Sequence, residues 1–101
     1  MISVKPLMIE DHSFVATSVQ LPKTNLLIIS NEIGYVMCGA LDVDLLNEKL
    51  SDRKIIAARA TGVKTIEQLL EAPLDKVTIE AKNKGWYKGI TTKDALLKIA
   101  E

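Results

Sequence analysis

Tyr35–Asp42 reads YVMCGALD and Ala57–Thr65 reads AARATGVKT, and these two stretches decide how the chain folds. In each stretch, an apolar run that favours a strand is followed by a glycine, Gly39 or Gly62, and then by a residue able to cap a helix. Such a corner leaves unpaired backbone N–H groups and the positive end of a helix dipole facing one spot. We expect both corners to lie at the same edge of the sheet, where they offer a binding place for an anion.

Four strands are predicted up to and including the first corner. The turn segments between them are short and contain Asp, Pro, Asn or Gly, so an antiparallel meander is the simplest arrangement. Pro6 indicates an edge or a bulge in the first strand. In the second strand, the odd-numbered side chains from Val15 to Leu21 are expected to face the core. The four predicted strands are Ile2–Ile9, Phe14–Leu21, Leu26–Ile29 and Tyr35–Ala40.

The remainder of the chain predicts helices with one strand among them. Asp42 begins a helix of about ten residues, and Ile55–Val63 forms the fifth strand. Thr65 and Gln68 match a capping box at the start of the next helix, which Pro73 ends. Leu74–Gly85 fits both a helix and a strand, and we expect a helix there; Thr91–Asp94 opens the last helix.

Together these elements predict one α+β domain over residues 1–101. It has two layers, with a mostly antiparallel or mixed sheet of about five strands and three to four helices. A single layer of helices covers one face of a sheet only. Because Leu26–Ile29 and Val36–Cys38 are apolar at both parities, we expect the second face to be buried as well, in a homodimer.

Composition narrows the classes of function. Thirteen basic residues balance thirteen acidic ones, so nothing favours binding to nucleic acid, which usually requires a basic surplus. The cluster of Trp86, Tyr87 and Lys88 is better explained by a Trp that anchors the last helix or an interface. No apolar run is long enough to span a bilayer, and the N-terminus has no signal-peptide pattern. We therefore expect a cytoplasmic protein with no membrane contact.

Four segments carry a resemblance to a known family. They are MCGALD at residues 37–42, RATGVKTIEQLL at 59–70, PLMIEDHSFVATSVQLPKTNLLII at 6–29 and GITTKDALLKIA at 89–100. In this order and spacing they resemble the YunC-like family of bacterial and archaeal domains of unknown function. The resemblance implies a small α/β domain, and it brings no established activity, cofactor or catalytic residue.

The leading functional hypothesis is a binding site for a small anionic or nucleotide-like ligand at the two corners. Two basic side chains would hold the anion, two hydroxyls would donate hydrogen bonds, and two glycines would allow close approach of the backbone. The predicted ligand-binding residues are Gly39, Arg59, Thr61, Gly62, Lys64 and Thr65. This segment is not a phosphate loop, because it lacks the first glycine and the four-residue spacer of that motif.

Two other classes of function stay open at this point. An enzyme would use Cys38 as its nucleophile with His12 as the base, or Asp42 with a metal. One cysteine and one histidine are too few for a zinc site, so we identify neither a metal site nor a cofactor. The third class is a structural dimer that docks on another protein.

Overall fold

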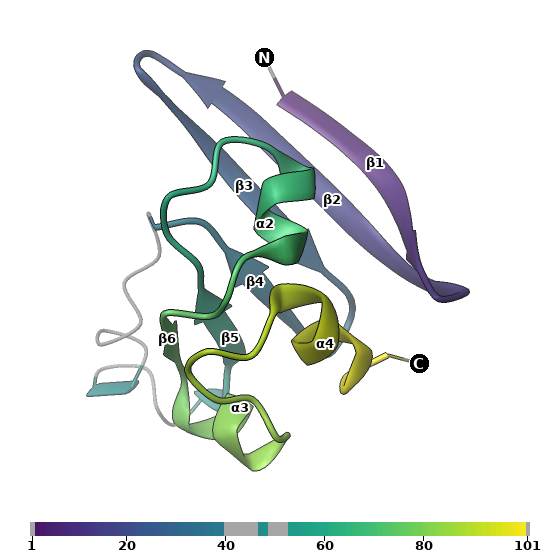
Figure 1. Cartoon of the computed structure of the whole chain (residues 1–101), viewed down its shortest axis with the longest axis vertical. Helices are drawn as coiled ribbons and strands as arrows, with labels where there is room; N and C mark the ends of the chain where they lie inside the picture. Colours follow the sequence, from purple (N-terminus) through teal and green to yellow (C-terminus); the bar gives the residue numbers. More distant parts are fainter. Residues whose placement is uncertain (1, 40–46, 49–52, 101) are drawn as a thin grey trace.

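The core of the fold is a mixed sheet of six strands in the order β1-β2-β3-β4-β5-β6 (Figure 1). The computed structural model describes residues 2–39, 47–48 and 53–100. All neighbouring strands are antiparallel except β4 and β5, which run parallel. The strands are β1 Ile2–Ile9, β2 His12–Leu21, β3 Thr24–Ser30, β4 Gly34–Met37, β5 Ile56–Arg59 and β6 Lys76–Val77. With its helices, the chain has the α+β fold that its sequence predicts.

Short turns produce the predicted meander of β1 to β4. Glu10 and Asp11 form the first turn with φ of 47° and 70°, the left-handed pair that matches the twist of a two-residue hairpin. The second turn contains Lys23 with φ of 66°. In the third turn the Oδ1 of Asn31 accepts hydrogen bonds from the backbone N–H groups of Ile33, at 2.9 Å, and Gly34, at 3.1 Å.

Three helices are described, and a threonine caps each of them. They are α2 Ile66–Glu71, α3 Ile79–Asn83 and α4 Thr92–Leu97. The capping hydroxyls of Thr65, Thr78 and Thr91 each accept a hydrogen bond from a backbone N–H in the first helical turn. The helices predicted after Thr65 and at the end of the chain are thus confirmed, whereas the helix expected from Asp42 lies outside the described residues except at 47–48, which are helical.

The expectation of one helix over Leu74–Gly85 is wrong. The segment divides at Thr78 into the short strand β6 and the short helix α3. The Oγ1 of Thr78 donates to the Ile55 carbonyl at 2.6 Å and accepts from the Ala57 N–H at 3.2 Å, so this residue is fixed to β5. Pairing with β5 therefore determines the strand conformation before Thr78. It overrides the helical preference that the sequence of the segment indicates.

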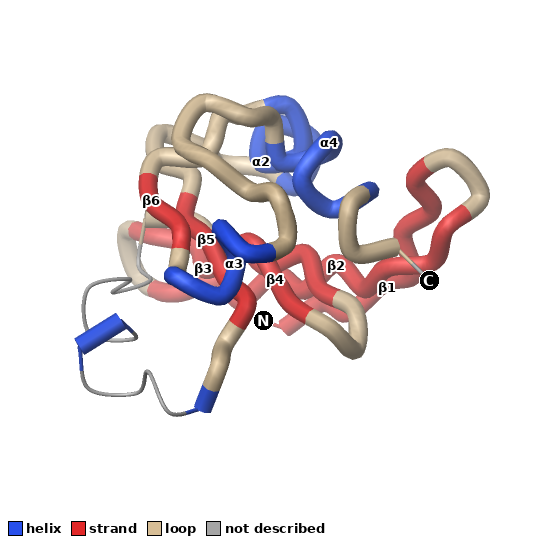
Figure 2. The backbone as a smooth tube through the Cα atoms, turned by 90° about the horizontal axis from the view of Figure 1, so that it is seen from below, coloured by secondary structure: helices blue, strands red, loops and turns tan. Residues whose placement is uncertain are grey.

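One face of the sheet carries the helices. Helix α2 packs against β3 and α4, and α4 packs against β4, so both helices lie on the same side (Figure 2). The core between them is largely aliphatic. Its two large aromatic side chains, Phe14 and Trp86, are each only 1% exposed, so Trp86 is a residue of this core.

The opposite face, which we call the outer sheet face, has no charged side chain along β1 to β4. Register places its members side by side, and they include Val15, which is 41% exposed. The expectation that the odd-numbered side chains of β2 face the core is therefore wrong, because the even-numbered Phe14 and Ala16 are the buried ones. The outer sheet face comprises Ile2, Val4, Pro6, Met8, Ser13, Val15, Thr17, Val19, Leu21, Thr24, Leu26, Ile28, Ser30, Tyr35 and Met37.

Candidate functional site

The two glycine corners lie next to each other at one edge of the sheet. Because β4 and β5 are parallel neighbours, their carboxyl ends meet there, and the Ala60 N–H donates to the Met37 carbonyl at 3.0 Å. A Cβ added to Gly39 would lie 3.4 Å from the Thr61 Cγ2. Gly39, Thr61 and Gly62 are all exposed. The helix predicted after the first corner, with Asp42, lies outside the described residues.

Thr65 caps α2 as its sequence predicts, but the Gln68 side chain bonds the N–H of the residue before the cap and not that of Thr65. The Thr65 Oγ1 accepts from the Gln68 N–H at 3.1 Å, and the Gln68 Oε1 accepts from the Lys64 N–H at 2.8 Å. These backbone donors are therefore already paired within the chain. An anion at this corner would be held mainly by side chains.

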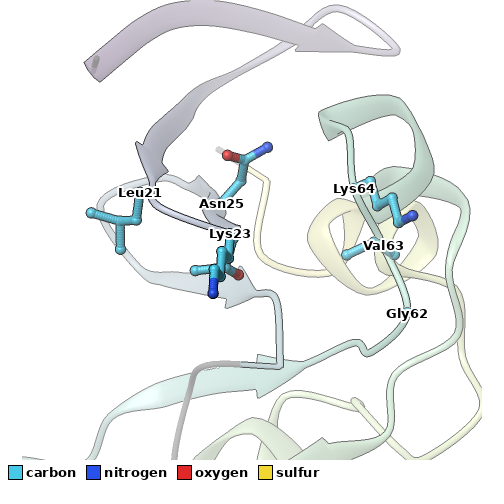
Figure 3. Close-up of a pocket in the computed structure, with 7 residues that line it drawn as sticks. Leu21, Lys23, Asn25, Gly62, Val63 and Lys64 are labelled. Carbon is cyan, nitrogen blue, oxygen red and sulfur yellow. The ribbon is translucent and has the colours of Figure 1, made fainter.

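Such side chains line an open cleft between the β2–β3 turn and the loop before α2, which we call the turn cleft (Figure 3). Its volume is about 550 Å³. Lys23 comes from one wall and Lys64 from the other. Within residues 2–39, 47–48 and 53–100, neither ammonium group has an ion-pair partner. The turn cleft is lined by Leu21, Lys23, Thr24, Asn25, Gly62, Val63 and Lys64.

A second hollow of about 390 Å³, the sheet groove, adjoins the turn cleft and shares Asn25 and Lys64 with it. The sheet groove runs over the helix side of β1 and β2, beside the start of α2. Its charged side chains are two lysines and one glutamate, and all of its other polar side chains carry hydroxyl or amide groups. It is lined by Ser3, Lys5, Pro6, Leu7, Ala16, Ser18, Gln20, Asn25, Leu27, Lys64, Thr65, Ile66 and Glu67.

Arg59 does not take part in either hollow. Its Nη2 lies 2.5 Å from the Asp75 Oδ2 in an ion pair, because the pairing of β5 with β6 brings Asp75 alongside it. The hydrogen bond from Arg59 holds the pKa of the Asp75 carboxyl below its ordinary value of 3.8. The structure therefore places Arg59 in a structural ion pair rather than beside Lys64.

The proposed thiol chemistry finds no partner in this arrangement. Cys38 is buried, and its Sγ–H donates to the Asn25 carbonyl at 3.6 Å. Asn25 pairs with Gln20 near the far end of β2, whereas His12 begins that strand. Eight residues of strand separate the two ends by roughly 25 Å, so the nucleophile and base expected from the sequence are not brought together.

No metal site is found among the described residues either. In that part of the chain, no group of three or more His, Cys, Asp or Glu side chains is placed to hold a metal ion. Asp42, the other candidate of the enzyme hypothesis, lies outside it.

Of the predicted ligand-binding residues, Gly62 and Lys64 line the turn cleft, and Lys64 and Thr65 line the sheet groove. Gly39 and Thr61 lie together but line neither hollow. Sequence reasoning missed the contribution of the β2–β3 turn, although its PKTN segment is a plain turn signal that carries a lysine. It also missed the polar residues Ser18 and Gln20, whose alternation along β2 marks the helix side of the strand as partly polar.

Comparison with known proteins shows which family the chain belongs to. A family model described as a domain of unknown function, DUF1805, matches residues 37–99. The uncharacterized protein YunC of Bacillus subtilis is 54% identical over 99 residues, which cover 98% of each chain. The crystal structure of a protein of unknown function from Thermoplasma acidophilum, TA1206, matches with a TM-score of 0.86 and 28% identity, over 97% of this chain and 92% of that one. Among the described residues, no helix has the length and apolar character needed to cross a bilayer.

Proposed function

This chain belongs to the DUF1805 family of domains of unknown function, and we propose that it binds a small anionic ligand in the turn cleft, between Lys23 and Lys64. One observation carries the proposal. Two lysines from segments far apart in the sequence face a shared hollow of about 550 Å³, and neither is neutralised by an acidic neighbour in the described part of the chain. Two positive charges on opposite walls favour an anion at the position between them.

The neighbouring polar groups suit a phosphate or carboxylate group. Asn25 and Thr24 add an amide and a hydroxyl to the turn cleft, and both side chains are hydrogen-bond donors. Gly62 has φ of 76°, and no other group lies within 4 Å of the position its Cβ would occupy. The backbone there is open to close approach by a ligand.

The sheet groove favours a ligand with a polar, uncharged body attached to the anionic group. Ser3, Ser18 and Gln20 line it, and hydroxyl and amide side chains pair well with the hydroxyls of a sugar. A sugar phosphate or nucleotide-like monophosphate fits this combination of two hollows. We propose that the protein binds such a ligand in the cytoplasm, where its single unpaired Cys38 is compatible with a reducing environment.

Calorimetric titration tests this proposal. The full chain is titrated at low ionic strength with inorganic phosphate, ribose 5-phosphate, AMP and acetate. We expect at least one phosphate compound to bind. A thermal melt gives a second readout, because a ligand present at 100 times its Kd stabilises a fold by about 2.7 kcal/mol. Lys64→Ala and Lys23→Ala should each weaken binding about tenfold or more, since each removes a charged hydrogen bond.

Lys93→Ala is the matched control, because Lys93 is an exposed lysine on α4 that lines neither hollow. It should bind like the unmodified chain. The proposal is wrong if no compound binds, or if all three lysine variants lose binding equally, which would indicate a general effect of charge. In the first case, a structural interaction module becomes the better explanation.

A further inference from the structure

The outer sheet face is an unusual surface for a chain of this composition. Charged residues make up 26% of the sequence, yet none of them lies on this face along β1 to β4. Its apolar side chains are well exposed: Ile2 is 69%, Val4 63% and Met8 59% accessible. Contiguous apolar surfaces of this kind on a soluble chain mark an interaction site.

We propose that the outer sheet face packs against the same face of a second copy of the chain. The face spans four strands about 4.8 Å apart and about eight residues at 3.3 Å each, which gives a flat area of roughly 500 Å². A standard interface buries ~800 Å² of accessible surface on each partner, and the accessible area of a sheet face exceeds its flat area because its side chains project from it. The whole face is therefore the right size for one sheet-on-sheet contact.

Symmetry favours a second copy as the occupant. A two-fold axis sets each patch against itself, so any charge near the axis would meet a like charge. This face carries aliphatic side chains with a few hydroxyls, among them Thr17 opposite Val4 and Ile28, and such a surface is complementary to itself. Two sheets packed in this way lie about 10 Å apart with their strands about 30° from alignment.

The edge of the sheet is a poorer place for self-association. Strand β1 is one edge strand of the sheet, as Pro6 indicates, and β6, the other, is only two residues long. Pro6 lies in the middle of β1 and has no N–H to donate, so a strand added there would meet an interrupted ladder. The contact we propose is accordingly face to face, and it shares only Leu21 and Thr24 with the turn cleft.

Sedimentation equilibrium of the full chain tests the proposal over about 1 to 100 μM. The expected mass is twice the 11.1 kDa of one chain. Val4→Glu and Val15→Glu each place two charges in the symmetric contact, and each should raise the dimer Kd about 100-fold or more. Tyr87→Glu is the matched control, because Tyr87 is 59% exposed and lies outside the outer sheet face; its dimer Kd should stay unchanged.

The isosteric double variant Val4→Thr with Val15→Thr tests the same contact if a charged variant does not fold. It keeps the β-branched shape that strands favour, and it should raise the dimer Kd about tenfold. A mass of one chain at every concentration overturns the proposal. A dimer whose Kd is unchanged by substitutions on this face also overturns it, because the copies then meet elsewhere.

Discussion

Lys23 is predicted to bind the anion while its backbone conformation lowers the stability of the fold. The substitution Lys23→Gly should remove both effects, so that stability rises while anion binding weakens. Lys23 is the second residue of the two-residue turn between β2 and β3, and its φ of 66° lies in the left-handed region. An L-residue loses about 1–2 kcal/mol in this conformation, which glycine adopts freely. Glycine also gives the unfolded chain more freedom, which removes about 0.4–1 kcal/mol of the gain.

The net effect of Lys23→Gly is a stability gain of about 0.5–1 kcal/mol, or a Tm higher by roughly 2–8 °C for a domain of this size. The same substitution removes one of the two cations of the turn cleft. Phosphate that raises the Tm of the unmodified chain should therefore raise that of Lys23→Gly much less. Thermal melts followed by circular dichroism, with and without phosphate at low ionic strength, measure both quantities.

Lys54→Gly provides the control for backbone strain. Lys54 has a similar φ of 53° but lines neither hollow, so its replacement should raise the Tm by a similar amount and leave the response to phosphate intact. If Lys23→Gly melts at or below the temperature of the unmodified chain, Lys23 does not strain the turn. If Lys23→Gly keeps the full phosphate response, Lys23 does not bind the anion.

Three further predictions concern the fold. Thr78→Val should lower the free energy of unfolding by about 3 kcal/mol in urea titrations, because the lost hydroxyl bonds three backbone groups. Gly34→Ala should lower the free energy of unfolding by about 2–4 kcal/mol, since the added Cβ would lie 2.5 Å from a carbonyl oxygen of β5. Gly39→Ala should lower it far less, because the nearest contact of its Cβ would be at 3.4 Å. The Arg59 pair lowers the pKa of Asp75 below 3.8, so its contribution is present above that pH and is lost as the pH falls through the lowered pKa. Asp75→Asn should therefore flatten the fall in stability measured by urea titrations from about pH 5 to pH 2.

Local chemistry in the sequence predicted much of this fold. The meander follows from apolar runs separated by turn residues. The spacing of Thr65 and Gln68 in the sequence predicts that Thr65 caps a helix. The proximity of Gly39 to Thr61 was also predictable once both corners were assigned to strand ends at one edge of the sheet. Each of these features depends on residues close together in the chain or on a simple rule of sheet geometry.

The rest depends on contacts between distant segments. Asp75 reaches Arg59 only because a two-residue strand pairs with β5, and no local pattern predicts so short a strand. Lys23 joins Lys64 across 41 positions of sequence because the β2–β3 turn extends to the same end of the sheet as the second corner. Both faces of β2 contain apolar residues, so its core face was decided by where the helices dock, which periodicity alone does not reveal.

The most direct test of the account is a titration of the ¹⁵N-labelled chain with inorganic phosphate, followed by the backbone amide resonances. We expect the largest saturable shifts in two separate segments, residues 23–25 and 62–65, with one common Kd. Shifts confined to other exposed lysines, such as Lys93 on α4, or no saturable shift in either segment, would contradict this expectation.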